Sequence, residues 1–167
     1  GLLGGTRFTD LGKSGCFGGG MRKGEVCGAV SGGIYGAVAQ GTSVADILRS
    51  AVDAMCSLGA KPGDIRAAMG AAIGRCCFET DDDVPTAVEK YLHGDTDGLF
   101  DRRPDGKTMV DLRAANARRL VQLGLLPENI DISPECTVCS HEKYWSHRYT
   151  KGNRGSQAAV IVLSAGE

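Results

Sequence analysis

Residues 43–62, "SVADILRSAVDAMCSLGAKP", carry the clearest secondary-structure pattern in this chain. Ser43 is followed three residues later by an aspartate, as in a helix capping box. Gly59 stands where helices commonly end, and Pro62 cannot continue one. We therefore predict a helix over about residues 43–58. Its apolar face is expected to pack inward through Val44, Ile47, Leu48, Ala51, Met55 and Leu58.

Further strands and helices alternate along the rest of the chain. Short apolar runs bounded by turn residues predict strands, whereas capped periodic runs predict helices. The predicted strands are 24–33, 64–74, 108–112, 128–133 and 156–165, and the predicted helices are 81–92 and 112–123, the latter capped by Asp111. Residues 93–107 are rich in turn residues and are expected to be solvated. The fold class is therefore α/β or α+β, with helices covering a mixed sheet.

Length, charge and cysteine content exclude several classes of protein. A chain of 167 residues can form one domain without disulfide bonds. The net charge of -1 and the absence of a basic stripe argue against nucleic acid as a partner. No apolar run reaches the roughly 18 residues that cross a bilayer, so no membrane partner is expected. Seven cysteines, an odd number, favour a reducing compartment, and we expect a cytoplasmic protein.

The first part of the chain is too rich in glycine for packed secondary structure. We expect residues 1–24 to be irregular and residues 25–167 to form the C-terminal portion of a domain whose N-terminal part is missing. Missing strands would leave unpaired sheet edges, through which two copies of the chain could associate.

The motif Cys136-x-x-Cys139 has the spacing of a zinc knuckle, but a structural zinc site normally needs four protein ligands. The other cysteine pair, Cys76 and Cys77, is adjacent in sequence, and adjacent side chains diverge in a strand. We therefore expect no complete metal site. A zinc or copper ion would use Cys136, Cys139 and His141, with Cys76 or Cys77 as a further ligand. Two other hypotheses remain open: a redox cysteine pair, and small buried cysteines without a chemical role.

Three long segments together resemble one family. They are residues 64–92, "DIRAAMGAAIGRCCFETDDDVPTAVEKYL", residues 105–133, "DGKTMVDLRAANARRLVQLGLLPENIDIS", and residues 135–163, "ECTVCSHEKYWSHRYTKGNRGSQAAVIVL". In order and spacing they resemble the laccase-domain family of YfiH-like proteins, described both as polyphenol oxidases and as purine nucleoside phosphorylases, over about residues 43–164. The resemblance implies a YfiH-like sandwich fold, a purine nucleoside and phosphate as substrates, phosphorolysis of adenosine or inosine, and adenosine deamination as a second activity. It also implies zinc or copper as a cofactor.

The resemblance places the family's catalytic trio, two histidines and a cysteine, in N-terminal segments. The last of these segments reads Ala-Val-His-Ala-Gly-Trp-Arg-Gly, and residues 29–36, "AVSGGIYG", occupy its place. Ser31 then stands where a histidine is expected, and a serine hydroxyl neither binds a soft metal well nor exchanges protons near pH 7. The trio is therefore not found in this chain. An inactive, nucleoside-binding remnant and a cysteine-based redox or zinc-binding protein are the alternative functions.

The same resemblance places Cys136, Thr137, Ser146 and Arg148 in the wall of a substrate pocket, where a hydroxyl, a thiol or a guanidinium could bind a nucleoside or phosphate. A second resemblance is confined to residues 15–33, "GCFGGGMRKGEVCGAVSGG". They are similar to a segment of the redox-active family named for its Cys-Gly-Cys-Ala-x-x-Gly-Cys-Cys motif, although the cysteine motif itself is absent.

Overall fold

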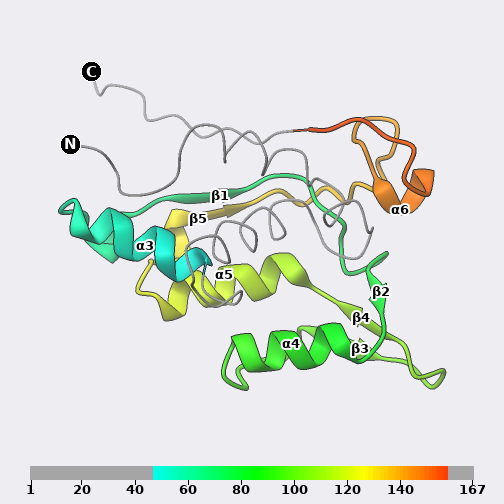
Figure 1. The fold of residues 1–167 in the computed structure, drawn as a ribbon, viewed down its shortest axis with the longest axis horizontal. Helices are drawn as coiled ribbons and strands as arrows, with labels where there is room; N and C mark the ends of the chain where they lie inside the picture. Colours follow the sequence, from blue (N-terminus) through cyan, green and yellow to red (C-terminus); the bar gives the residue numbers. More distant parts are fainter. Residues whose placement is uncertain (1–46, 158–167) are drawn as a thin grey trace.

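The computed structural model describes residues 47–157, in which helices are interspersed with short strands (Figure 1). In chain order they are α3 (Ile47–Ser57), η2 (Pro62–Asp64), β1 (Ala67–Met69), β2 (Glu79–Thr80), α4 (Asp83–Tyr91), β3 (Phe100–Arg102), β4 (Thr108–Val110), α5 (Leu112–Gln122), η3 (Pro127–Asn129), β5 (Ile130–Ile132) and α6 (His147–Thr150). Within these described residues, no helix is long and apolar enough to cross a membrane.

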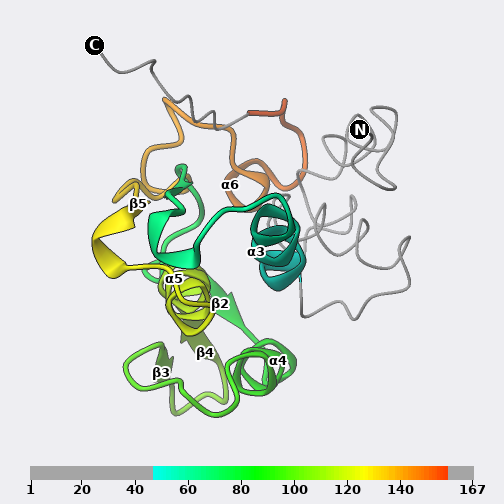
Figure 2. The ribbon, with the colours of Figure 1, turned by 90° about the vertical axis from the view of Figure 1, so that its left-hand side faces the viewer.

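The described strands form two small sheets of different kinds. β1 and β5 pair in parallel, with Ala67 opposite Ile130. In the second sheet β4 is central and pairs antiparallel with both β2 and β3. This combination of parallel and antiparallel pairing with covering helices confirms the predicted mixed α/β class. Figures 1 and 2 show α5 in the middle, between the β1–β5 pair and α4.

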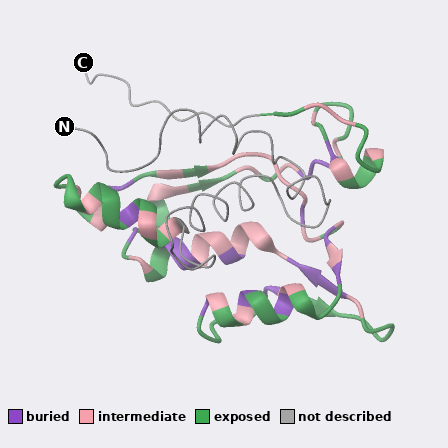
Figure 3. Ribbon diagram, in the orientation of Figure 1, coloured by how far each residue is buried: buried purple, intermediate pink, exposed green. Residues whose placement is uncertain are grey.

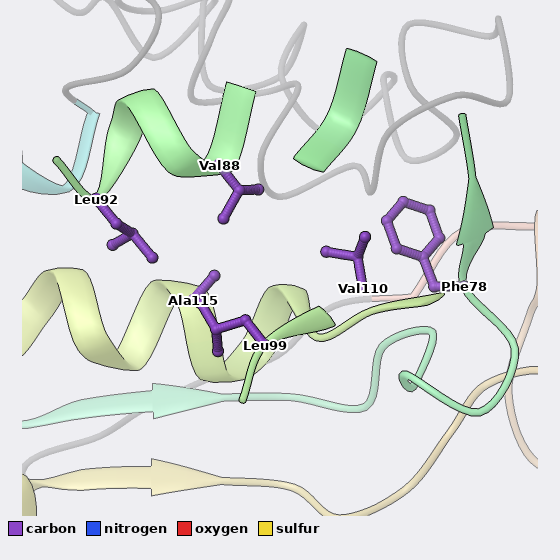
Figure 4. Close-up of a cluster of buried hydrophobic side chains, with 6 residues drawn as sticks. All are labelled: Phe78, Val88, Leu92, Leu99, Val110 and Ala115. Atoms are coloured by element: carbon purple, nitrogen blue, oxygen red, sulfur yellow. The ribbon is translucent and has the colours of Figure 1, made fainter. Parts of the chain in front are cut away.

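Two hydrophobic clusters form the core, and α5 contributes to both. The first joins α4, α5 and the antiparallel sheet (Figure 4) and consists of Phe78, Val88, Leu92, Leu99, Val110 and Ala115. The second joins α3 to the other end of α5 and consists of Val52, Ile65, Leu120 and Leu125. Figure 3 shows β4 buried, while much of the outer surface of α3 and α4 is exposed. Each fully buried aliphatic side chain stabilises the fold by about 1.5–3 kcal/mol.

The predicted inward face of α3 is wrong in part. Leu48 does pack against the second cluster, together with Val52, which is 5% exposed. Ala51 is exposed, and Met55 and Leu58 are 42% and 71% exposed. The apolar residues of α3 cover a wide arc of the helix, from Ala51 through Leu48 to Val52, and periodicity alone does not tell which part of that arc meets α5. The prediction for Ser43 and Val44, and for the side chain of Ile47, lies outside the described residues.

The two later helices follow their sequence signals. The Asp111 side chain accepts a hydrogen bond from the backbone N–H of Ala114 at 3.0 Å and so caps α5. Gly124, with φ of +96°, follows the helix as a C-terminal glycine does. Asp82 occupies the N-cap position of α4, but its side chain makes no capping hydrogen bond and lies 3.4 Å from Arg102 instead. Charge and position, rather than a side-chain cap, therefore mark the start of α4.

The expectation that residues 93–107 are solvated throughout is wrong. They contain β3, which forms a hairpin with β4 and places Phe100 opposite Val110. Leu99, directly before the strand, is 1% exposed. Two apolar residues are too few to produce a visible period, so only the pairing with β4 identifies the strand. The strand predicted at 24–33, and most of the one predicted at 156–165, lie outside the described residues.

Candidate functional site

Four cysteine side chains converge at one place in the structure. The sulfur atoms of Cys76, Cys77, Cys136 and Cys139 all lie within 4.8 Å of one another. The Sγ of Cys139 is 3.6 Å from that of Cys76 and 3.5 Å from that of Cys77. We call these residues the four-cysteine cluster. It combines two pairs that are far apart in the sequence, since Cys77 and Cys136 differ by 59 positions and Cys76 and Cys139 by 63.

The parallel pairing of β1 and β5 continues beyond both strands and brings the two pairs together. The N–H of Ser133 donates to the carbonyl of Met69 at 2.9 Å. Further on, Ala72 and Cys136 form an isolated parallel bridge, and the N–H of Thr137 donates to the carbonyl of Ala72 at 3.0 Å. The segments that follow β1 and β5 therefore run side by side until each of them enters a turn.

Cys76 and Cys77 lie in one turn, and Cys136, at the bridge to Ala72, begins a second turn that contains Cys139. The N–H of Cys77 donates to the carbonyl of Gly74 at 2.9 Å, and the N–H of Ser140 donates to that of Cys136 at the same distance. Alternation of side chains between two faces is a property of strands, and it does not hold in a turn. The prediction that Cys76 and Cys77 diverge is therefore wrong, and the supply of ligands no longer excludes a complete set of four thiols.

Gly74 allows the two turns to approach closely. Its N–H donates to the Sγ of Cys136 at 3.2 Å. A Cβ added at Gly74 would lie 3.2 Å from the Cβ of Cys136 and 3.3 Å from the Sγ of Cys76. From α5, Arg113 donates a hydrogen bond to the carbonyl of Glu135 at 3.0 Å. The second turn is thus fixed by backbone and guanidinium contacts as well as by its cysteines.

The cluster contains thiols of different acidity. Burial, the largest influence on Cys136, would raise its pKa, but hydrogen bonds from the backbone N–H groups of Cys139, Gly74 and Val138 lower the pKa to about 6. Burial, and then hydrogen bonding with Cys139, raises the pKa of both thiols in the 74–77 turn. The pKa of Cys136 therefore lies below, and the pKa values of Cys76 and Cys77 lie above, the ordinary value of a thiol.

His141 is not a member of the four-cysteine cluster. Its Nδ1 lies 3.1 Å from the carbonyl oxygen of Val138. Its ring stacks on Tyr149, with 3.6 Å between the ring centroids. The side chains that join Cys136 and Cys139 are the thiols of the first turn rather than this imidazole.

The other side chains predicted for a pocket wall make structural contacts. Thr137 and Ser146 are buried, and the Oγ of Ser146 accepts a hydrogen bond from the N–H of Tyr149 at 3.3 Å, which caps α6. Both terminal nitrogens of Arg148 donate to the carbonyl of Glu79 at 3.3 Å. Figure 1 shows α6 at the same end of the described part as β2. A contact between these side chains and a substrate remains a prediction.

An open depression of about 480 Å³ lies beside the cluster and is lined by Arg75, Cys76, Asp101, Arg103 and Met109. Arg75 pairs with Asp101, and Arg103 lies 2.6 Å from a carboxylate oxygen of Glu79. Sequence reasoning missed this depression because the β2–β4–β3 sheet brings its two arginines together from separate segments. The signal in the sequence was the pair Arg102 and Arg103, in the stretch 93–107 that we expected to be solvated.

Ser31, which the family resemblance places where a catalytic histidine is expected, lies outside the described residues.

Comparison with known proteins identifies the family. The family model of the multi-copper polyphenol oxidoreductase laccase matches residues 21–164, a range that includes most of the 15–33 segment. The chain is 39% identical to "Adenosine deaminase RL5" from an unknown prokaryotic organism, over 68% of this chain and 43% of that protein. It is 35% identical to the "Purine nucleoside phosphorylase Cgl2154/cg2365" of Corynebacterium glutamicum, over 70% of this chain and 44% of that protein.

Solved structures agree with this assignment. YlmD from Geobacillus stearothermophilus aligns with a TM-score of 0.63 at 27% identity, over 75% of this chain and 43% of that one. The YfiH protein of Bacillus licheniformis aligns with a TM-score of 0.59 over 74% of this chain and 43% of that one. The chain thus spans less than half the length of these relatives and has the YfiH-like fold. It belongs to the laccase-domain family, the multi-copper polyphenol oxidoreductase laccases.

Proposed function

We propose that this chain is part of a purine nucleoside phosphorylase that cleaves adenosine or inosine with phosphate, with adenosine deamination as a second activity. The observation that carries the proposal is the family match over residues 21–164, together with relatives whose names state these activities. In phosphorolysis a phosphate oxygen bonds to C1′ of the ribose while the bond from C1′ to the purine nitrogen breaks. The electron pair of that bond leaves with the purine, which takes up a proton.

The arginines of the depression are suited to binding the phosphate. Two guanidinium groups, those of Arg75 and Arg103, line a space whose volume falls in the usual range for small-molecule sites. A guanidinium offers a planar fork that matches two phosphate oxygens. These residues would hold and orient the phosphate for attack on C1′ of the ribose. Orienting one reactant toward the other in this way lowers the activation barrier of the reaction.

The carboxylates that now pair with these arginines do not prevent phosphate binding. The side chains of Arg103 and Glu79 are 46% and 40% exposed, so their ion pair stabilises the fold by only about 0–1 kcal/mol. Hydrogen bonds from a guanidinium to a phosphate are worth about 1.5–3 kcal/mol each. Phosphate can therefore displace the carboxylate at little cost.

Copper, which the family's name implies, does not fit the described residues. Copper oxidase centres use imidazole ligands in addition to thiolates. The chain has three histidines, His93, His141 and His147, and in the described part none of them belongs to a cluster of metal-ligating side chains. The reaction proposed for this chain therefore uses no copper.

The second candidate function is a nucleoside-binding remnant without turnover. Ser31 favours it, since this residue stands where the family resemblance places a catalytic histidine. A hydroxyl cannot transfer protons near pH 7 as imidazole does. In this case the depression would retain its ligand while the chemical step is lost.

A phosphate-dependent assay separates the two functions. The 167-residue chain is incubated with inosine or adenosine, with and without phosphate, and release of hypoxanthine or adenine is measured. Arg75→Gln and Arg103→Gln are each expected to raise KM for phosphate roughly ten- to a hundredfold, the equivalent of about 1.5–3 kcal/mol. Arg66→Gln, at an exposed arginine outside the depression, is the matched control and should leave KM unchanged.

Each alternative has its own result. If calorimetry detects binding of the nucleoside but no purine is released, the result would favour the nucleoside-binding remnant. Neither binding nor release, by a chain that is folded by circular dichroism, would overturn both functions.

A further inference from the structure

We propose that the four-cysteine cluster is a structural zinc site, in which the sulfurs of Cys76, Cys77, Cys136 and Cys139 bind one Zn²⁺. The site adjoins the depression that we propose binds phosphate, because Cys76 belongs to both, but the zinc proposal rests on the positions of the four sulfurs and not on the phosphorolysis.

The mutual distances of the four sulfurs match a tetrahedral thiolate site. Zinc binds cysteine sulfur at about 2.3 Å, so the sulfurs of a regular tetrahedron are about 3.8 Å apart. Two of the distances in the cluster are 3.5 and 3.6 Å, and all of them are within 4.8 Å. An ordinary contact between two thiols would fix only one such distance. Convergence of all four on one point is what a single ion requires.

The cluster is supported by contacts that do not involve the sulfurs of other cysteines. The N–H of Gly74 donates to the Sγ of Cys136, which is the kind of outer hydrogen bond that stabilises a ligating thiolate. Both turns are closed by backbone hydrogen bonds. Arg113, on α5, also donates to the carbonyl of Glu135, next to the turn that begins at Cys136. The ligands are therefore positioned by the fold before the ion arrives.

The surrounding charge favours an anionic metal centre. Four thiolates and one Zn²⁺ carry a net double negative charge. A Cβ added at Gly74 would lie 3.2 Å from a terminal nitrogen of Arg113 and 3.3 Å from the Sγ of Cys76, which places this guanidinium close to the cluster. Its positive charge would offset part of the charge that four thiolates bring to a partly buried place.

A zinc ion at this position would link the two sheets of the fold. Cys77 is followed directly by Phe78 and β2, and Cys136 lies in the extension of β5. The ion would close a loop of 59 positions between Cys77 and Cys136, and the entropy lost on closing a loop in the unfolded chain increases with loop length. With four protein ligands the site has no open position, so its role is structural and not catalytic.

Zinc is the metal that this donor set favours. Tetrahedral sites with four thiolates hold zinc or iron, whereas copper centres of the oxidase type require imidazole. Cys76 and Cys139 are exposed, so an ion can reach the cluster from solvent. The same exposure would allow an oxidant to join these two sulfurs, which are 3.6 Å apart, as a disulfide, and this is the main competing state.

Metal analysis of the 167-residue chain, purified under reducing conditions without a chelator, tests the site. We expect about one equivalent of zinc per chain, and X-ray absorption at the zinc edge with four sulfur neighbours at about 2.3 Å. Cys76→Ser and Cys139→Ser, at the two exposed ligands, should each lower the zinc content at least severalfold. Cys56→Ser is the matched control, because Cys56 lies on α3 outside the cluster and should leave one equivalent in place.

Several results would overturn the proposal. These are no bound zinc after reduction and addition of zinc, nitrogen or oxygen neighbours in the absorption spectrum, bound iron, or a disulfide among these cysteines under reducing conditions. If the serine variants do not fold, the absorption spectrum of the unaltered chain still decides. Co²⁺ added to metal-free protein gives a second spectrum of the same kind, with the intense visible bands of a tetrahedral thiolate site expected and their absence opposing the proposal.

Discussion

The close approach of the two cysteine turns predicts a large effect of one methyl group at residue 74. In Gly74→Ala the new Cβ would lie 3.2 Å from the Cβ of Cys136, 3.2 Å from a terminal nitrogen of Arg113 and 3.3 Å from the Sγ of Cys76. All three distances are shorter than ordinary contact, so these neighbours must give by a few tenths of an ångström. Overpacking of this kind costs about 1–3 kcal/mol.

A smaller opposing effect comes from the unfolded chain. Alanine restricts the unfolded chain more than glycine does, which stabilises the folded state by about 0.4–1 kcal/mol where the native backbone accepts a side chain. The net expectation for Gly74→Ala is a loss of about 1–2 kcal/mol in the free energy of unfolding. Displacement of Cys136 should also weaken zinc binding at the four-cysteine cluster.

Gly63→Ala provides the control for this prediction. A Cβ at Gly63 would meet only Leu126, at 3.9 Å or more, which is an ordinary contact. This variant is therefore expected to be neutral or slightly stabilising. Both free energies can be measured by urea unfolding followed by circular dichroism. If Gly74→Ala were as stable as Gly63→Ala, the packing of the two turns described here would be refuted.

Further substitutions at three positions test the fold. Leu92→Ala removes a side chain that is 0% exposed in the first cluster and should lower the free energy of unfolding by about 2–5 kcal/mol, whereas Met55→Ala, at a position 42% exposed, should change it by less than about 0.5 kcal/mol. An equal loss for both would contradict the assignment of the inner face of α3. Asp111→Ala should cost about 1 kcal/mol by removing the cap of α5, and Asp111→Asn should retain most of that stability, both read from the same urea curves. Equal stability of the alanine and asparagine variants would show that the cap contributes nothing.

The elements that the sequence predicted correctly are those with local signals. The cap at Asp111 and the glycine at 124 define α5, and both signals act within one turn of the helix. The inner face of α3 has no such signal. Val52 is buried because it meets the second cluster, and that contact depends on residues from α5 and beyond.

The cysteine cluster shows a different limit of local reasoning. The residues after Gly74 include two cysteines and a phenylalanine, an apolar run that is also typical of a strand. The structure forms a turn there, since the carbonyl of Gly74 accepts hydrogen bonds from the N–H groups of both Cys77 and Phe78. Gly74 was the available clue to a turn, but the partner turn at Cys136 is set by strand pairing across a long sequence distance.

The central claim, phosphorolysis of a purine nucleoside, is tested most directly by identifying the sugar product. The 167-residue chain is incubated with inosine and phosphate, and the products are separated and quantified. Phosphorolysis predicts ribose 1-phosphate and hypoxanthine in equal amounts, with no product when phosphate is left out. Free ribose in place of ribose 1-phosphate, or no product from a folded chain, would contradict it.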